Sequence, residues 1–112
     1  MKKQLLLSEL ITLLSYEFCF EVALFEEDEE GNVYRGDSPV GFYECQKDDP
    51  YTGYYTYKHI GDKILKNRAD FGDLVVIGIE KYYQCDTDTE YDFQVCCKVK
   101  KDQVEWIKDR GK

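Results

Sequence analysis

The sequence predicts an α+β domain: an antiparallel sheet of four to five strands, with an N-terminal helix packed on one face and a short C-terminal helix. Three observations support this prediction. An apolar stripe at helical spacing lies near the start, two segments alternate in polarity, and the middle of the chain is rich in turn residues. The 112 residues have the length of one domain, so we expect a single domain over residues 1–112.

The first two elements follow from hydrophobic periodicity. Residues 6–15 predict a helix, because their leucines recur at helical spacing and form one stripe. Residues 17–25 alternate with period two, which predicts a strand with one buried face. The helical stripe carries Leu6, Leu10, Leu13 and Leu14; the strand buries Phe18, Phe20, Val22 and Leu24 and exposes Glu17, Cys19, Glu21 and Ala23.

The acidic block at 26–30 and the pair Gly31-Asn32 predict a turn, after which residues 33–35 start a return strand and complete a hairpin. Residues 36–58 are punctuated by glycine and proline, so long elements are not expected there. Their tyrosines and threonines favour a short strand over 54–58. Residues 60–66 fit either a strand or one helical turn.

Residues 73–83 predict the clearest central strand, because their apolar run is broken only by Gly78. Residues 89–100 alternate and predict its antiparallel hairpin partner, with residues 84–88 as the link. The inward residues are Tyr91, Phe93, Val95, Cys97 and Val99, and the outward residues are Glu90, Asp92, Gln94, Cys96, Lys98 and Lys100. Residues 102–109 predict the short C-terminal helix.

The charge balance excludes two classes of function. The chain has 15 Lys and Arg against 23 Asp and Glu, a net charge of −8. Non-specific nucleic-acid binding and attachment to an anionic membrane both need a cationic protein. We therefore expect neither direct nucleic-acid binding nor a membrane partner.

The cysteines and the opening residues bear on localisation. The five cysteines are an odd number, and Glu9 interrupts the only apolar run that resembles a secretory signal. No apolar stretch is long enough to span a membrane. These features predict reduced thiols and a cytoplasmic protein.

No motif predicts catalysis, a metal or a cofactor. His59 is the only histidine, and a thiol enzyme built on Cys45 and His59 has no motif to support it. The run from Asp86 to Glu90 resembles the first half of an EF-hand loop. The match fails at Tyr91, where glycine is needed, and at Cys97, where glutamate is needed. We expect a non-enzymatic protein that uses neither cofactor nor metal.

Two acidic rows and a group of tyrosines form the predicted partner-binding surface. On a strand, residues two apart share a face, so alternating acids form a regular file of carboxylates that suits a basic groove. Tyrosine is enriched at interface hot spots. The residues are Glu26, Glu27, Asp28, Glu29, Glu30, Tyr54, Tyr55, Tyr57, Asp86, Asp88, Glu90 and Asp92. The alternatives are a solvated acidic face that keeps the protein soluble and tyrosines that pack on the core.

The opening LSELITLLS, the strand FEVALF and the following VYRGDSP resemble small acidic proteins carried by phages and mobile elements of Gram-positive bacteria. The resemblance covers about the first 40 residues. Some of these proteins inhibit bacterial defence systems, anti-CRISPR proteins among them, and some imitate DNA. The resemblance implies an inhibitor that binds a nuclease complex, and it assigns no functional residue.

Two functional hypotheses follow. The first is a protein-binding inhibitor whose partner is a larger basic protein or nucleoprotein complex, attracted by the acidic rows and held by the tyrosines. The second is a self-associating structural or accessory protein of a phage or mobile element, in which the tyrosine surface forms a homodimer. An enzyme is a third class, which would depend on His59 or a cysteine.

Overall fold

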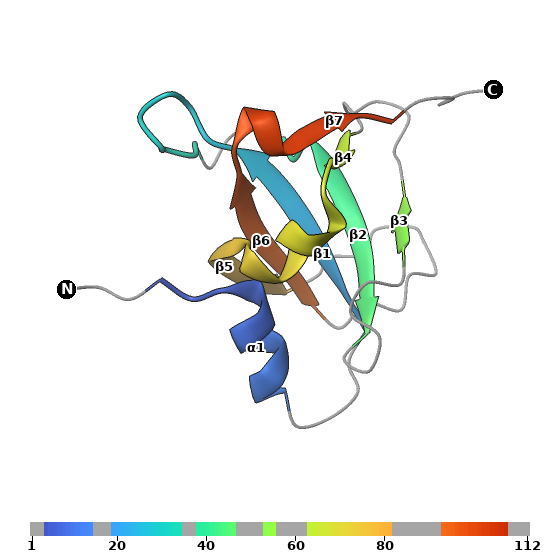
Figure 1. Ribbon diagram of the computed structural model, residues 1–112. Helices are drawn as coiled ribbons and strands as arrows, with labels where there is room; N and C mark the ends of the chain where they lie inside the picture. The colour runs from blue at the N-terminus through green and yellow to red at the C-terminus, as the bar shows by residue number, and fades with distance from the viewer. Residues whose placement is uncertain are drawn as a thin grey trace.

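The computed structural model describes residues 4–14, 19–34, 38–46, 53–55, 63–81 and 93–107. Its elements, labelled in Figure 1 where space allows, are α1 (Leu7–Leu13), β1 (Cys19–Glu26), β2 (Gly41–Gln46), β3 (Gly53–Tyr55), β4 (Lys63–Leu65), the 3₁₀ helix η1 (Arg68–Asp73), β5 (Val75–Lys81), β6 (Phe93–Val99), the 3₁₀ helix η2 (Lys101–Gln103) and β7 (Val104–Trp106). The α+β class and the N-terminal helix are confirmed.

Five of the described strands form one large sheet in the order β3-β2-β1-β6-β5, and β4 pairs with β7 in a second sheet of two strands. The pairs β2–β3, β1–β2 and β5–β6 are antiparallel, whereas β1 and β6 run parallel, with Val22 opposite Val95. The sheet is therefore mixed, and the prediction of an antiparallel sheet is wrong in this respect. Alternation within a strand reports which face is buried but not the direction of a distant partner strand.

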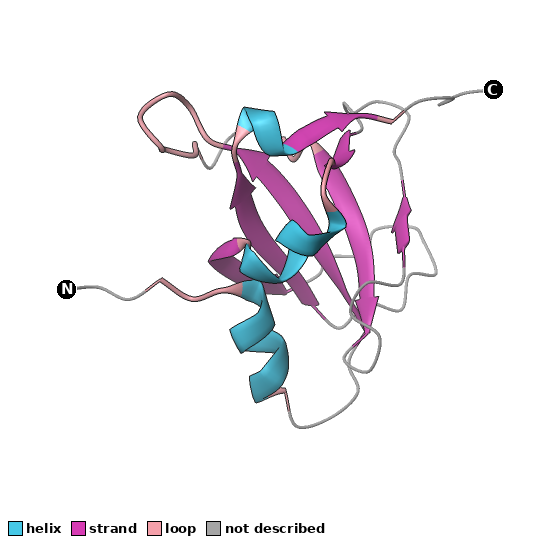
Figure 2. Ribbon diagram, viewed as in Figure 1, coloured by secondary structure: helices cyan, strands magenta, loops and turns pink. Residues whose placement is uncertain are grey.

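One face of the large sheet carries the hydrophobic core. Side chains from β1, β2 and β6 are buried there against α1, η1, β4 and β7, which cover this face in Figures 1 and 2. The cluster contains Leu7, Leu10, Phe20, Val22, Leu24, Tyr43, Cys45, Leu65, Phe71, Leu74, Val95, Cys97, Val99 and Val104. The predicted inward faces of the first and last long strands are thus confirmed where the structure describes them. Leu13 of the predicted stripe is instead 73% exposed.

The opposite face, here called the second face, is also buried in its middle. Glu21 and Ala23 of β1 are 1% and 0% exposed, and Cys96 of β6 is 5% exposed. The prediction that these residues face solvent is wrong. β1 and β6 are interior strands with a neighbour on each side, and the turn after β1 lies beside Cys96. The side chains of the flanking strands and this turn reduce the exposure of the second face there.

The small sheet of β4 and β7 is anchored on β2. The Lys63 backbone N–H donates to the Val40 carbonyl at 2.8 Å, and the Leu65 N–H donates to the hydroxyl of buried Tyr43 at 2.9 Å. The Tyr43 ring also meets Phe71 edge-on, with 5.3 Å between the ring centroids. At least one tyrosine is therefore a core residue that satisfies a buried backbone donor.

Three further predictions need correction. Residues 101–106 form η2 and β7, where a short C-terminal helix was expected; β7 pairs antiparallel with β4, and this distant pairing overrides the local pattern. The partner of β1 in the hairpin is β2 rather than a strand that starts at Val33. The strand β5 lies at an edge rather than in the centre of the sheet, and its apolar run includes Ile77 and Ile79, which are 44% and 51% exposed.

The remaining strand predictions fall partly on described residues. β3 confirms a strand in the tyrosine segment through residue 55, and β4 resolves the ambiguous segment as a strand over 63–65. The hairpin of β5 and β6 is antiparallel as expected. Residues 56–62 and the link at 84–88 lie outside the described residues.

Candidate functional site

The acidic block becomes a tight turn at the end of β1, here called the acidic turn (residues 26–32). The Gly31 N–H donates to the Asp28 carbonyl at 3.0 Å, and the Asp28 N–H donates to the Asn32 carbonyl at 2.8 Å. Gly31 has φ 85°, in the left-handed region that glycine adopts without strain. The Asp28 carboxylate accepts the N–H groups of Glu30 and Asn32, both at 2.9 Å, so the sequence DEEGN fixes its own conformation.

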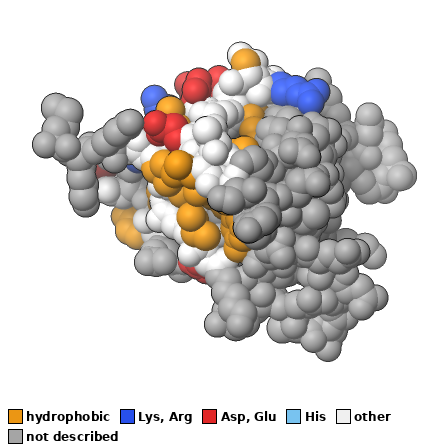
Figure 3. Space-filling model, turned by 90° about the horizontal axis from the view of Figure 1, so that it is seen from below, with side chains coloured by type: hydrophobic (Ala, Val, Ile, Leu, Met, Phe, Trp, Pro, Cys, Tyr) orange, Lys and Arg blue, Asp and Glu red, His pale blue; other side chains and the backbone are white. Residues whose placement is uncertain are grey.

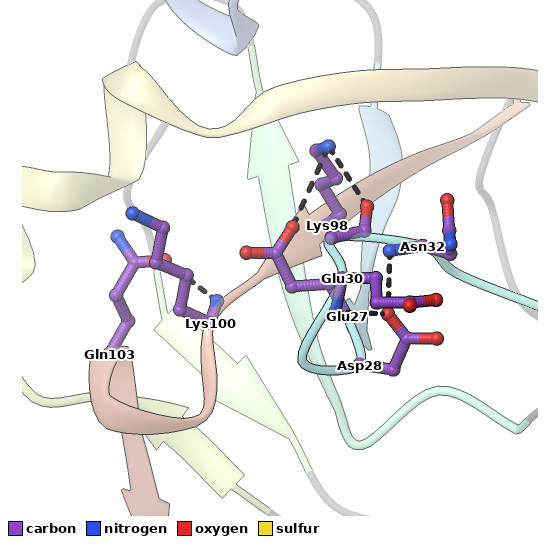
Figure 4. A network of polar contacts seen from close by, with 8 residues as sticks. Glu27, Asp28, Glu30, Asn32, Lys98, Lys100 and Gln103 are labelled. Atoms are coloured by element: carbon purple, nitrogen blue, oxygen red, sulfur yellow. Dashed lines mark hydrogen bonds and ion pairs between the residues drawn. The ribbon is translucent and has the colours of Figure 1, made fainter.

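Two of the acids are engaged in ion pairs. The Lys63 ammonium lies 2.6 Å from the Glu26 carboxylate, and the Lys98 ammonium lies 3.6 Å from that of Glu27. Lys98 also donates to the Gly31 carbonyl at 3.4 Å, so it ties the turn to β6, as Figure 4 shows. These two glutamates thereby anchor the turn, and their charges are partly balanced by neighbouring lysines.

Glu29 and Glu30 remain as the exposed carboxylates of the acidic turn. They occupy the middle of the turn between the Asp28 side-chain acceptor and Gly31. The backbone beneath them is held by the hydrogen bonds of Asp28. The turn therefore presents two adjacent carboxylates on a hydrogen-bonded backbone, next to the end of the parallel pair β1–β6.

The conformation of the turn is expected to depend on pH. The backbone hydrogen bond from Asn32 is the largest cause that lowers the pKa of Asp28 below its ordinary value of 3.8, and those from Glu30 and Gly31 and a side-chain hydrogen bond from Tyr34 act in the same direction. Ionised Asp28 therefore stabilises the turn above pH 3.8, the ordinary pKa of the group. This stabilisation is lost as the pH falls through the lowered pKa of Asp28. Amide chemical shifts of Glu30 and Asn32 are expected to titrate with a midpoint below 3.8; a midpoint at or above 3.8 would contradict the hydrogen-bonding role of Asp28.

A buried polar pair on the second face was missed by sequence reasoning. The Gln94 side-chain amide donates to the Glu21 carboxylate, and the Gln94 oxygen lies 3.5 Å from the Cys96 sulfur. By strand register, Glu44, Glu21, Gln94 and Glu80 form one row across four strands. A glutamate inside the apolar run FEVALF, with alanine as its neighbour on the same face, was the available signal. A buried carboxylate is tolerated only when it is hydrogen-bonded.

The other predicted site residues are described only in part. Tyr54 and Tyr55 lie on β3, where they pair with β2 at Tyr43 and Phe42. Tyr57 and the second acidic row, Asp86, Asp88, Glu90 and Asp92, lie outside the described residues. Their part in binding stays a prediction, as does the proximity of the two acidic rows.

Three cysteines of the described strands are buried thiols. Cys45, Cys96 and Cys97 are not joined by disulfides, and they are 1%, 5% and 0% exposed. Burial, with a smaller effect of Cys96, raises the pKa of the Cys97 thiol far above its ordinary value, so this thiol stays protonated and unreactive at neutral pH. His59 lies outside the described residues. Within the part of the chain that the structure describes, no three metal-ligating side chains come together.

α1 has seven residues, and the described residues contain no helix of the length and apolar character needed to cross a membrane.

Comparison of the chain with protein-family models, with curated proteins and with solved structures finds no match. The site must therefore be interpreted from its own geometry and charge. That geometry is a hydrogen-bonded acidic turn, beside a partly apolar surface on the second face of the sheet.

Proposed function

We propose that the protein is a non-enzymatic inhibitor that binds a larger basic protein or nucleoprotein complex that handles nucleic acid. The observation that supports this most directly is the acidic turn, in which Glu29 and Glu30 are exposed on a backbone fixed by Asp28. By its resemblance to small acidic phage proteins, the protein is expected to target a bacterial defence nuclease in the manner of an anti-CRISPR protein. The complex would form in the cytoplasm.

The physical basis is preorganised charge. A turn that is already ordered loses little conformational freedom when it binds, so more of its electrostatic attraction appears as affinity. The net charge of −8 attracts a cationic partner over a distance and raises the association rate. Carboxylates in a fixed array occupy a basic groove as the phosphates of DNA do. The tyrosines at 54, 55 and 57 would supply the desolvated anchors.

Neutralising the exposed acids should therefore weaken the complex. The double variant Glu29→Gln, Glu30→Gln is expected to lose at least about tenfold in partner capture at low salt, which corresponds to about 1.4 kcal/mol. The measurement is affinity capture from a bacterial lysate with mass spectrometry, near 0.01 M and 0.15 M ionic strength, where the screening length changes from about 30 to 8 Å. The captured nuclease is then assayed for cleavage of its substrate with and without the protein.

A matched control variant has the same net charge as the Glu29→Gln, Glu30→Gln variant. Asp102 and Glu105 are exposed acids of η2 and β7, so Asp102→Asn, Glu105→Gln removes two charges and keeps all the acids of the acidic turn. This control is expected to retain capture and inhibition. Equal loss in both double variants, capture that ignores salt, or a captured nuclease whose cleavage is unchanged would each overturn the proposal.

A second candidate is self-association through the face that carries α1. Leu13 and Leu5 are 73% and 36% exposed there, and with Thr12 and Gln4 they line a shallow depression. Figure 3 shows hydrophobic side chains gathered on the described part of this face. Light scattering of the purified protein decides between the inhibitor and the self-associating protein. A homodimer that becomes monomeric on Leu13→Lys supports a structural or accessory role. A monomer contradicts self-association through this face.

A further inference from the structure

A surface hollow of about 290 Å³ lies on the second face, next to the acidic turn. Its floor is formed by Gly78 of β5 and Cys96 of β6, which are cross-strand neighbours. Phe25 at the end of β1, Val33 after the acidic turn and Ile77 of β5 contribute its apolar walls. The other lining residues are Gly31, Asn32, Glu80 and Lys98.

The hollow exists because its floor has little side-chain volume. A Cβ placed on Gly78 would meet no atom within 4 Å, so the space above this residue is open. Cys96 beside it is small and 5% exposed. Ile77, at the rim, is 44% exposed. An apolar side chain that enters the hollow would cover Ile77 and remove apolar surface from water, which lowers the free energy.

The size and position of the hollow favour a side chain of a protein partner. Small-molecule sites span about 300 to 1,000 Å³, and this hollow is at the lower limit, where one or two side chains fit. It adjoins β5, the edge strand. The segment before α1 already adds to this edge, since the Val76 N–H donates to the Leu5 carbonyl at 2.8 Å and Leu6 bridges Val75. An extended partner segment docks on a sheet edge in the same manner.

The surrounding charges favour a basic segment. Glu29 and Glu30 directly precede Gly31, which lines the hollow. Lys98, the cation among the described lining residues, contacts the Glu27 carboxylate at 3.6 Å and the Gly31 carbonyl at 3.4 Å (Figure 4), so it is already partnered. A lysine or arginine next to the inserted side chain would therefore lie against two exposed carboxylates.

We infer that the hollow binds an aliphatic side chain of the partner, presented on an extended segment with lysine or arginine beside it. This inference rests on the proposed function and names the chemistry of the segment that the inhibitor recognises. The acidic turn supplies the electrostatic attraction, and the hollow supplies the apolar contact and thereby the selectivity among basic partners.

The test is a titration of the full chain, followed by amide chemical shifts, with three short synthetic peptides. The first has leucine flanked by lysines, the second has serine in place of leucine, and the third has leucine flanked by glutamates. The first peptide is expected to shift the signals of Gly78, Cys96 and Val33 and to bind at least tenfold more tightly than the other two. Gly78→Val fills the floor and is expected to weaken binding of the first peptide at least tenfold. Gly78→Ala is expected to retain most of the binding of this peptide.

Valine suits a strand and the space at Gly78 is open, so Gly78→Val is expected to fold. A thermal melt of this variant checks that it does. Val33→Ser, on the wall of the hollow, is the second variant. If the lysine–serine peptide binds as well as the lysine–leucine peptide, the hollow has no role while the acidic-turn function stands. If the glutamate–leucine peptide binds equally well, the hollow binds apolar side chains but the preference for a basic partner fails. Shifts that depend on protein concentration without peptide would assign the hollow to a second copy and overturn the inference.

Discussion

Replacing Gly41 with alanine is expected to destabilise the protein by at least about 3 kcal/mol, near the upper end of the usual cost of overpacking. A Cβ on Gly41, the first residue of β2, would collide with the carbonyl oxygen of Lys63 and lie 3.1 Å from its carbonyl carbon. These are backbone atoms that cannot rotate away. β4 would have to move, which would break the hydrogen bond from the Lys63 N–H to the Val40 carbonyl. Urea unfolding measures the loss as a lower midpoint.

Gly78→Ala is the matched control. This glycine also lies in a strand, but a Cβ there meets nothing within 4 Å. Alanine loses less conformational freedom on folding than glycine, so the control is expected to be neutral or more stable by about 0.5 kcal/mol. If the two substitutions had equal effects, β4 would not approach β2 as closely as the structure places it.

Breaking the buried polar pair is the second large effect. Gln94→Leu removes the amide that donates to the Glu21 carboxylate, which is 1% exposed. A hydrogen bond to a charged group contributes about 1.5–3 kcal/mol, and removal of the Gln94 amide takes away part of what offsets the desolvation of Glu21. We expect Gln94→Leu to destabilise by about 2 kcal/mol, measured by urea unfolding.

A double-mutant cycle isolates this interaction. Glu21→Leu together with Gln94→Leu removes both polar groups, and we expect the double variant to lose less than the sum of the single variants by about 1 kcal/mol or more. Glu21→Gln keeps the volume and an acceptor oxygen, so it is expected to be the mildest change at this position. Additive losses would show that Glu21 and Gln94 do not interact through their side chains.

Parts of the fold were predictable because they depend on local periodicity. The leucine spacing at 6–15 indicates α1, and alternation identifies β1, β6 and their core faces in residues such as Val22 and Val95. The acidic block followed by Gly31 predicts a turn for reasons contained in the turn itself, namely the side chain of Asp28 and the positive φ of Gly31.

The candidate site was predictable only in part. Composition identifies the block 26–30 as acidic, but it does not tell which carboxylates stay free. Lys63 and Lys98, far along the chain, engage Glu26 and Glu27 and leave Glu29 and Glu30 exposed. The hollow has no sequence signature either, because it depends on Gly78, Cys96 and Val33 meeting across three segments.

The sequence by itself determined the identity of the local elements, the acidity of the protein and the position of the turn, because each depends on residues a few positions apart. Tertiary structure alone decided the parallel pairing of β1 with β6, the burial of Glu21 and the pairing of β7 with β4. Those outcomes depend on which distant segments lie side by side. An alternating pattern is compatible with several neighbours, and the choice among them depends on how the whole core packs.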